Sequence, residues 1–136
     1  MRKIILLFFS TLIFSSCIPS KKNTVSFTDE CKFVEKVIEK DWKKAENENY
    51  FIRNDDFLLR LQKDYRNCII GLSRNDIITL FGKPFEENDL EISYYFLDKG
   101  CMEVLPKNCE MLIFYHDKSE QRKVIGYDIQ KHVYHD

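Results

Sequence analysis

The stretch CIIGLSRNDIITLFGKP, residues 68–84, decides the fold of this protein. Gly71 suits a tight entry into a helix, and Ser73 followed by Asp76 has the spacing of a capping box. Apolar residues over two helical turns come next, and the Gly-Lys-Pro run at residues 82–84 prevents the helix from continuing. The Gly-Lys pair does not indicate a phosphate-binding loop, because such a loop precedes its helix and continues with Ser or Thr. The stretch therefore predicts a short, capped helix rather than a ligand site.

Two longer amphipathic helices are predicted before this stretch. The first begins after Thr28 as its N-cap, and acidic residues in its first turn complement the helix dipole. The second runs from about residue 54 or 55 to residue 67. Each helix carries one apolar stripe at helical spacing, which predicts packing against a core. The stripes consist of Cys31, Val34, Ile38, Trp42 and Ala45 in the first helix, and of Leu58, Leu61, Tyr65 and Cys68 in the second.

Three β-strands are predicted after Pro84, because the chain there becomes rich in β-branched and aromatic residues. Inward-facing positions of the last strand are expected to alternate with polar or small residues. Short connections predict an antiparallel meander, with the helices on its apolar face. The predicted fold class is therefore α+β, with N-terminal helices packed on a three-stranded antiparallel meander. The strands are expected over residues 91–97, 110–116 and 123–133, the last with Ile125, Tyr127, Ile129 and Val133 facing inward.

The first residues indicate export and a lipid anchor. Arg2 and Lys3 precede an apolar run over residues 4–14, which is shorter than the roughly 20 residues that span a bilayer. The run ends in FSSC, which resembles the lipobox of bacterial lipoproteins, and the Cys of that motif carries the lipid. The alternative is an ordinary signal peptide with an unmodified Cys. We expect a lipoprotein signal peptide over residues 1–16, the lipidated Cys17 with a flexible tether over residues 17–27, and a single α+β domain over residues 28–136.

The cysteine count indicates disulfides. Of the five cysteines, four remain if Cys17 carries lipid, and an even number is typical of an oxidising compartment. Four cysteines allow three connectivities. Cys101 and Cys109 flank a predicted hairpin tip, which makes their pairing the simplest and leaves Cys31 with Cys68. Free buried thiols are the alternative, whereas a metal site would need closer pairs such as C-x-x-C.

The composition and the spacing of residues give little support to nucleic-acid binding, metal binding or catalysis. The formal net charge is −1, and without an obviously basic face nucleic acid is not an expected partner. His116, His132 and His135 are candidate metal ligands or catalytic bases, but no spacing of carboxylates or thiols supports either role. Paired cysteines would leave no thiol for a Cys–His nucleophile. We therefore expect no enzymatic activity, no cofactor, no metal and no small-molecule substrate.

Aromatic side chains are the more suggestive feature, since the chain contains 7 Tyr and 11 Phe. Successive residues of a strand face opposite sides, so an aromatic run places rings on both faces of a sheet. Rings on the face that the helices leave open would form a protein-binding surface. The alternative is that dimerisation or overhanging loops cover them. The predicted partner-binding residues are Tyr94, Tyr95, Tyr115 and Tyr127.

Together these segments resemble a known family. GLSRNDIITLFGKP, followed by ISYYF, MLIFY and KVIGYDI, is similar to the SmpA/OmlA small lipoproteins, the BamE-like family. The likeness covers about residues 69–130, and the same helix–helix–three-strand unit is similar to the repeat of the β-lactamase-inhibitor proteins. The chain departs from the family in its helical region over residues 28–67 and in its extra cysteines. The matching positions are Gly71, Leu72, Ser73, Asp76, Ile77, Phe81, Gly82 and Pro84.

The resemblance implies an envelope lipoprotein that acts by binding other proteins. Such a protein would be anchored in the outer membrane, would face the periplasm and would serve barrel assembly or envelope maintenance as an accessory. Its expected partners are envelope proteins, including barrel-assembly components, and the membrane through its lipid. One alternative is an inhibitor or immunity-type protein that binds a specific enzyme. The other is a small hydrolase using a His and a carboxylate.

Overall fold

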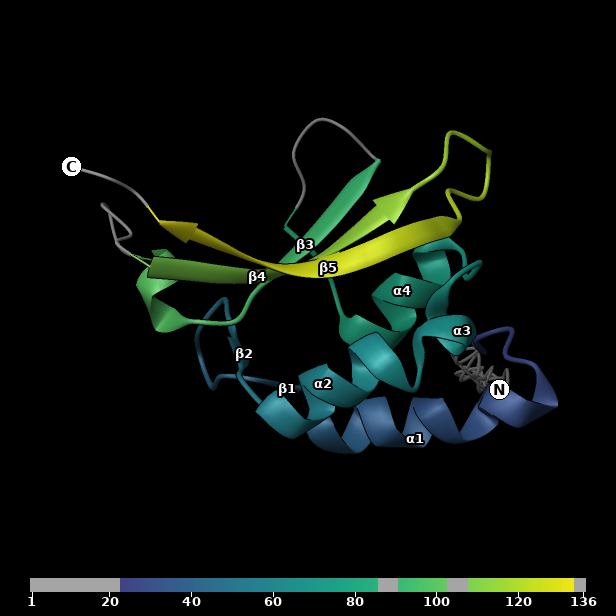
Figure 1. Ribbon diagram of the computed structural model, residues 1–136, viewed down its shortest axis with the longest axis horizontal. Helices are drawn as coiled ribbons and strands as arrows, with labels where there is room; N and C mark the ends of the chain where they lie inside the picture. The colour runs from purple at the N-terminus through teal and green to yellow at the C-terminus, as the bar shows by residue number, and fades with distance from the viewer. Residues whose placement is uncertain (1–22, 86–90, 103–107, 134–136) are drawn as a thin grey trace, which may run out of the picture.

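Within residues 23–85, 91–102 and 108–133, which the computed structural model describes, four α-helices lie against a three-stranded sheet (Figure 1). The helices are α1 (Lys32–Asp41), α2 (Asp55–Lys63), α3 (Arg66–Ile69) and α4 (Arg74–Phe81), with the 3₁₀ turns η1 (Asp29–Cys31) and η2 (Lys99–Met102). The strands are β1 (Lys43–Lys44), β2 (Phe51–Ile52), β3 (Ile92–Phe96), β4 (Asn108–His116) and β5 (Val124–Val133).

The larger sheet has the order β3-β4-β5, and both neighbouring pairs are antiparallel. All four α-helices lie on one side of it, with α1 furthest from the strands (Figure 1). The predicted α+β fold with a three-stranded meander is therefore confirmed. The sequence did not predict the small antiparallel pair β1-β2, which follows α1. None of the helices in the described ranges is long and apolar enough to cross a membrane.

The capped helix predicted from the sequence is α4. Ser73 Oγ accepts a hydrogen bond from the Asp76 N–H at 3.1 Å, and the Asp76 carboxylate accepts one from the Ser73 N–H at 3.0 Å, which completes a capping box. Gly82 ends the helix with a φ of 88°, a conformation that residues with a Cβ rarely adopt. Gly71 has a φ of 89°, and its N–H donates to the Val124 carbonyl at 2.8 Å. The stretch therefore joins the helix layer to the last strand.

The first helix is shorter than its apolar stripe predicts. It ends at Asp41, and Trp42 has an extended backbone with φ −95° and ψ 102°. The Trp42 indole N–H donates to the Phe81 carbonyl at 2.9 Å, and the ring stacks on Phe51 with centroids 4.3 Å apart. The end of α1 thus coincides with a contact to α4, although the apolar pattern alone predicts that the helix continues. Ala45, predicted on the helix, lies beyond β1 instead.

The second predicted helix is divided in two. α2 ends at Lys63 and α3 begins at Arg66. At the break, the N–H groups of Asp64 and Tyr65 both donate to the Arg60 carbonyl, at 2.7 and 3.0 Å. This shared acceptor widens the turn and interrupts the regular series of helical hydrogen bonds. Tyr65 is buried at the break, so packing rather than local propensity decides where the helix is interrupted.

A bulge in β5 changes the predicted alternation of the last strand. Consecutive residues of β4, Tyr115 and His116, pair with positions on either side of Ile125, which is therefore an extra residue. Because of this extra residue, Val124 and Tyr127 face the same side although they are three positions apart. Both are buried, whereas Ile125, predicted to face inward, is 63% exposed. That part of the prediction is wrong. The Val133 side chain lies outside the described residues.

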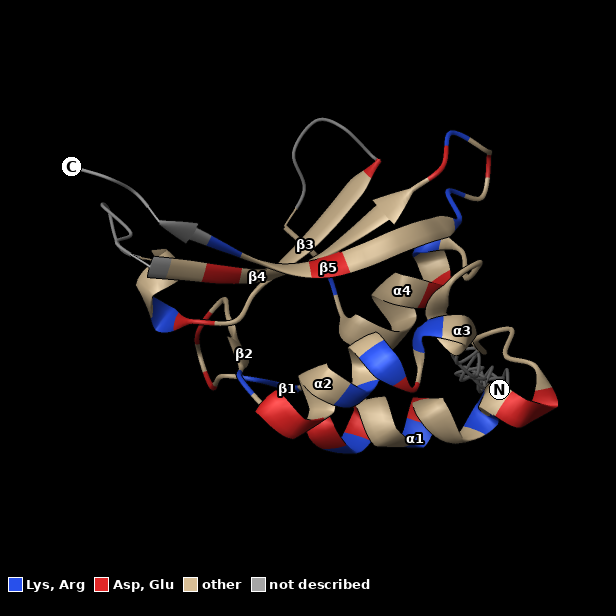
Figure 2. Ribbon diagram, viewed as in Figure 1, with Lys and Arg blue, Asp and Glu red and all other residues tan. Residues whose placement is uncertain are grey.

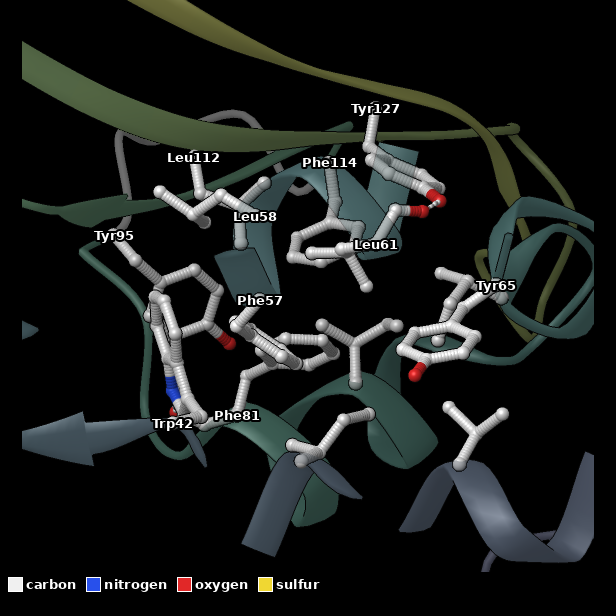
Figure 3. Packing of buried hydrophobic residues seen from close by; sticks show 14 of the residues in the cluster. Trp42, Phe57, Leu58, Leu61, Tyr65, Phe81, Tyr95, Leu112, Phe114 and Tyr127 are labelled. Atoms are coloured by element: carbon white, nitrogen blue, oxygen red, sulfur yellow. Dashed lines mark hydrogen bonds between the residues drawn. The ribbon is translucent and has the colours of Figure 1, made fainter. Parts of the chain in front are cut away.

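The core lies between the helix layer and the adjoining face of the sheet. Aromatic rings from both layers meet there in a connected cluster (Figure 3). The residues labelled in that view are Trp42, Phe57, Leu58, Leu61, Tyr65, Phe81, Tyr95, Leu112, Phe114 and Tyr127. Burying a large ring in such a cluster contributes several kcal/mol, roughly what truncation to Ala costs.

The packed domain begins earlier than the sequence predicts. Val25 is buried in the core, and Phe27 packs against it. Both residues fall in the predicted tether over residues 17–27, so its last part belongs to the folded domain. The predicted signal peptide over residues 1–16 and Cys17 lie outside the described residues.

Candidate functional site

Two disulfides hold the described part of the domain together. Cys31 in η1 is bonded to Cys68 in α3, with Cα atoms 5.5 Å apart, and Cys101 in η2 is bonded to Cys109 in β4, with Cα atoms 4.6 Å apart. This is the pairing that the sequence favoured, and it is confirmed. The first bond ties the entry of the chain to the helix layer, and the second ties η2 to the sheet.

Two of the four predicted partner-binding tyrosines lie in the core (Figure 3). Tyr95 is 0% exposed, and its hydroxyl donates to the Gly82 carbonyl at 2.8 Å. Tyr127 is 4% exposed, its hydroxyl donates to the Leu61 carbonyl, and the Arg66 guanidinium lies 5.1 Å from its ring centroid. Burial raises the pKa of Tyr127 to about 12. The prediction that these two tyrosines bind a partner is wrong, because they are on the face that the helices cover.

The other two tyrosines, Tyr94 and Tyr115, project from the opposite face of the sheet, which none of the described helices covers (Figure 1). The β3–β4 register places Tyr94 beside Ile113, and the rows on either side of this pair add further apolar side chains. Most of these side chains are half-buried. We call this surface the aromatic face; it consists of Phe85, Ile92, Tyr94, Phe96, Met111, Ile113 and Tyr115.

Three rings form a cluster at the β3 edge of the aromatic face. Phe85 forms an isolated antiparallel bridge with Tyr94, so its backbone extends the sheet by one residue. The Phe85 ring centroid lies 4.4 Å from that of Phe96 and 6.0 Å from that of Tyr94. The Tyr94 and Phe96 centroids are 5.6 Å apart. Mutual contacts of this kind hold aromatic rings in defined positions.

Tyr115 is held in place on the other side of the aromatic face. A Cβ at Gly126 would lie 4.0 Å from the Tyr115 ring, so the ring packs over the glycine in β5. The Tyr115 hydroxyl accepts a hydrogen bond from Gln130 Nε2 at 2.8 Å. Contacts among rings at the β3 edge and contacts of Tyr115, in the central strand, with β5 therefore hold the aromatic face in place, and binding there would cost little side-chain entropy.

A Ser–His pair lies on the buried side of the sheet. Ser93 Oγ and His116 Nε2 are 2.9 Å apart, and His116 Nδ1 lies 2.8 Å from the Arg122 carbonyl. A carbonyl only accepts hydrogen bonds, so Nδ1 carries the proton and Nε2 accepts the bond from the Ser93 hydroxyl. Ser93 is 0% exposed and His116 is 3% exposed. A substrate cannot reach such a serine, so the pair serves to fasten the β4–β5 turn to the sheet.

The pKa values around this turn follow from burial and hydrogen bonding. Burial lowers the pKa of His116, and the charges of Arg74 and Arg122 lower it further against the opposing effects of the Arg122 carbonyl and Asp117. The Ser119 hydroxyl lowers the pKa of Asp117, whose carboxylate also accepts from the Lys123 N–H. The fold therefore favours the neutral form of the His116 imidazole.

Three histidines were candidates for metal ligands or catalytic bases on the basis of the sequence. His116 is placed by the contacts above, whereas the side chain of His132 and the whole of His135 lie outside the described residues. Among the described residues, no three or more His, Cys, Asp and Glu side chains are grouped so that they could hold a metal ion.

An open groove of about 970 Å³ lies at one end of the molecule, between the start of α4 and the β4–β5 turn. Its lining is mostly polar and includes Arg74, Lys118, Arg122 and Lys123. The Arg74 N–H donates to the Gln121 carbonyl at 3.2 Å, which links the two walls.

Sequence reasoning missed several residues of the aromatic face, namely Phe85, Phe96, Met111 and Ile113. Strand parity contained a usable signal, because Phe96 and Tyr94 are two positions apart and must share a face. The sequence alone did not indicate which face the helices cover, so it could not separate Tyr94 from Tyr95. Phe85 lies outside every predicted strand, and only its tertiary bridge to β3 brings it to this surface.

No family model, no curated protein and no solved structure matches this chain.

Proposed function

We propose that this protein is a lipid-anchored envelope protein that binds other proteins through the aromatic face and has no catalytic activity of its own. One observation carries the proposal: the face of the sheet opposite the helix layer bears ordered aromatic side chains that no described helix covers. Half-buried rings in fixed positions are suited to the centre of a protein interface, where aromatic residues supply much of the binding energy.

The export signal and the Cys17 motif support the location in the cell envelope. Two disulfides fit an oxidising compartment. The resemblance to the SmpA/OmlA lipoproteins adds an accessory role in outer-membrane protein assembly or envelope maintenance. In this proposal the lipid keeps the domain at the membrane, while the sheet presents a preformed surface to a neighbouring protein.

Pulldown of the anchored protein from its native membrane, after crosslinking, tests the proposal. Tyr94→Asp together with Phe96→Asp places two charges in the ring cluster and should reduce recovered partner by about tenfold or more, as loss of a central aromatic contact does. Leu59→Asp together with Ile52→Asp is the matched control, since these two apolar residues are 50% and 54% exposed and do not belong to the aromatic face. Equal partner recovery from both double variants would contradict the proposed surface.

The identity of the recovered partner separates the two functional alternatives. Recovery of barrel-assembly components would support the accessory role, whereas a single enzyme bound in a 1:1 complex would support the inhibitor or immunity role. Acyl labelling tests the anchor independently: Cys17→Ser should abolish incorporation of a labelled fatty acid, and unchanged incorporation would refute lipidation at this residue.

A further inference from the structure

Other parts of the chain occupy the β5 edge of the β3-β4-β5 sheet. The Val124 N–H donates to the Leu72 carbonyl and the Val124 carbonyl accepts from the Gly71 N–H, both at 2.8 Å. Further along β5, the Ile129 N–H donates to the Asp128 carboxylate at 2.7 Å instead of to β4. A side chain thus takes the place that the backbone of a neighbouring strand would have.

The β3 edge is occupied in the same way. The Tyr94 N–H donates to the Phe85 carbonyl at 3.4 Å, and the Tyr94 carbonyl accepts from the Phe85 N–H at 2.9 Å. A partner strand that extended the sheet would have to displace these bonds at either edge. We therefore expect the partner to dock on the aromatic face itself.

The aromatic face has the outline of a narrow strip. Its strand residues form three successive cross-strand rows, and the first and third rows are four residues apart. At about 3.4 Å per residue, the rows extend about 14 Å along the strands. From Phe85 across β3 to β4 the strip covers two strand spacings, or about 10 Å. The rows pair Ile92 with Tyr115, Tyr94 with Ile113, and Phe96 with Met111.

These dimensions fit a single α-helix. With its side chains a helix is about 10–12 Å wide, and residues four positions apart rise by about 6 Å, close to the roughly 7 Å between rows. Apolar residues at i, i+4 and i+8 of an amphipathic helix can therefore meet one row each. A second copy packed sheet on sheet would cover only this strip of about 140 Å² in outline. That is far less than the roughly 800 Å² per partner of a stable interface.

One charge borders the strip. Asp128 in β5 pairs with Ile113, so its side chain lies on the same face, and it is exposed. Figure 2 shows it as an acidic band near the middle of β5. β5 extends the three rows with Gly126, Asp128 and Gln130, so Asp128 is their only charged residue. Within the described ranges it has no ion-pair partner.

We infer that the aromatic face binds an amphipathic α-helix of the partner, which lies along β3 and β4 with its apolar stripe on the three rows. A lysine or arginine on the flank of that helix pairs with the Asp128 carboxylate and fixes the rotation of the helix about its axis. This inference rests on the proposed function, because it names the partner element that the same surface takes.

Site-specific photocrosslinking in the native membrane tests for the helix. In the full lipidated protein, p-benzoylphenylalanine replaces one residue at a time in each row, and mass spectrometry identifies the partner residue that each position captures. Residues captured from successive rows should be three or four positions apart in the partner sequence. The control position is Leu59, which is 50% exposed on α2. The three test positions are Ile92, Tyr94 and Phe96.

The other outcomes separate this inference from the proposed function. Captured residues two positions apart would indicate an extended strand, and captured residues in unrelated segments would indicate an irregular surface. Either result would overturn the helix and leave the proposed function standing. Capture of a peptide of this same chain would indicate a dimer and would also overturn the helix. If no test position captures more partner than Leu59 does, the aromatic face is not the binding surface and the proposed function fails.

Charge variants test the role of Asp128. Asp128→Lys should reduce recovered partner about fivefold or more at low salt, because it sets two cations against each other, and high salt should narrow the loss. Asp128→Asn retains an acceptor for the Ile129 N–H and should lose less. The matched control is Glu39→Lys, the same charge change at an exposed position of α1, which lies furthest from the strands. Equal recovery from Asp128→Lys and Glu39→Lys would overturn the pairing with Asp128.

Discussion

The two faces of the β3-β4-β5 sheet are built from the same kinds of residue and have different surroundings. Tyr95 and Phe114 on one face contact the rings of the helix layer, and Tyr95 is fully buried with a hydrogen-bonded hydroxyl. On the other face, Tyr94 packs against the rings of Phe85 and Phe96, and the Tyr115 hydroxyl accepts a hydrogen bond from Gln130. Adjacent positions in one strand are thus fully buried on one side and half-buried on the other, where we propose that they bind a partner. Side-chain chemistry does not separate the two roles; strand parity and the placement of the helices do.

The largest expected contrast is between neighbouring residues of β4. Phe114→Ala should lower the free energy of unfolding by about 3–5 kcal/mol, because it leaves a cavity between Phe81, Tyr95 and Tyr127. Tyr115→Ala should cost about 1 kcal/mol, since its ring is only half-buried. Urea unfolding measures both values. Equal losses would show that the aromatic face is as much a part of the core as the helix-covered face.

The two disulfides allow a second comparison of the helix layer with the sheet, because one bond lies in the helix layer and the other lies beside the sheet. Cys31–Cys68 closes a separation of 37 residues in the helix layer, and Cys101–Cys109 closes one of 8 residues beside the sheet. If chain entropy dominates, replacing each pair by Ala should cost about 4 and about 2.5 kcal/mol, respectively. Thermal unfolding of the two double variants should therefore rank them in this order, and the reverse order would indicate that native-state contacts outweigh loop length.

We expect His116 to make the stability of the domain sensitive to acid. Its pKa is lowered from 6.5 by burial, so the unfolded chain binds its proton more readily than the fold does. The stability that neutral His116 contributes is complete above about pH 6.5 and declines as the pH falls below that value, by at most ~1.4 kcal/mol per pH unit.

Urea unfolding between pH 7.5 and 5 measures this effect, and His116→Gln should flatten the profile in that range. The ionised carboxylate of Asp117, whose pKa is lowered by the Ser119 hydroxyl, contributes its full stability above about pH 4 and loses it only below that value, so it does not change the profile between pH 7.5 and 5. An unchanged profile in His116→Gln would assign the acid sensitivity to other groups.

The smallest expected effect concerns the cap of α4. Ser73→Ala removes the acceptor of the Asp76 N–H and should cost about 1 kcal/mol. Ser73→Asp retains an acceptor and should cost less. Because α4 packs beneath the strands rather than on the aromatic face (Figure 1), neither variant should change partner recovery in the pulldown. Loss of recovery in Ser73→Ala would mean that the α4 end takes part in partner binding.

Much of the fold could be predicted from local patterns. Strand positions and the capped α4 with its Gly82 end follow from signals that act over a few residues, such as alternation and capping spacing. The pairing of Cys101 with Cys109 was favoured because they are close in sequence, and Cys31–Cys68, 37 residues apart, followed from it only by elimination. The ends of α1 and α2 could not be predicted in this way. Trp42 leaves the helix where its indole bonds to Phe81, 39 residues away, and no local pattern contains that partner.

The same distinction between local patterns and tertiary contacts applies to the candidate binding surface. The sequence by itself determined that aromatic rings would occupy both faces of a small sheet, because the side chains of a strand alternate. The inward position of Tyr127 was also predicted from strand alternation and is confirmed. Only the tertiary structure decided that Tyr95 belongs to the core, that Ile125 turns outward at a bulge, and that Phe85 joins Tyr94 and Phe96. The physical reason is that burial is a property of packed layers: it depends on which face the helices cover, and that choice is made by contacts between residues far apart in the chain.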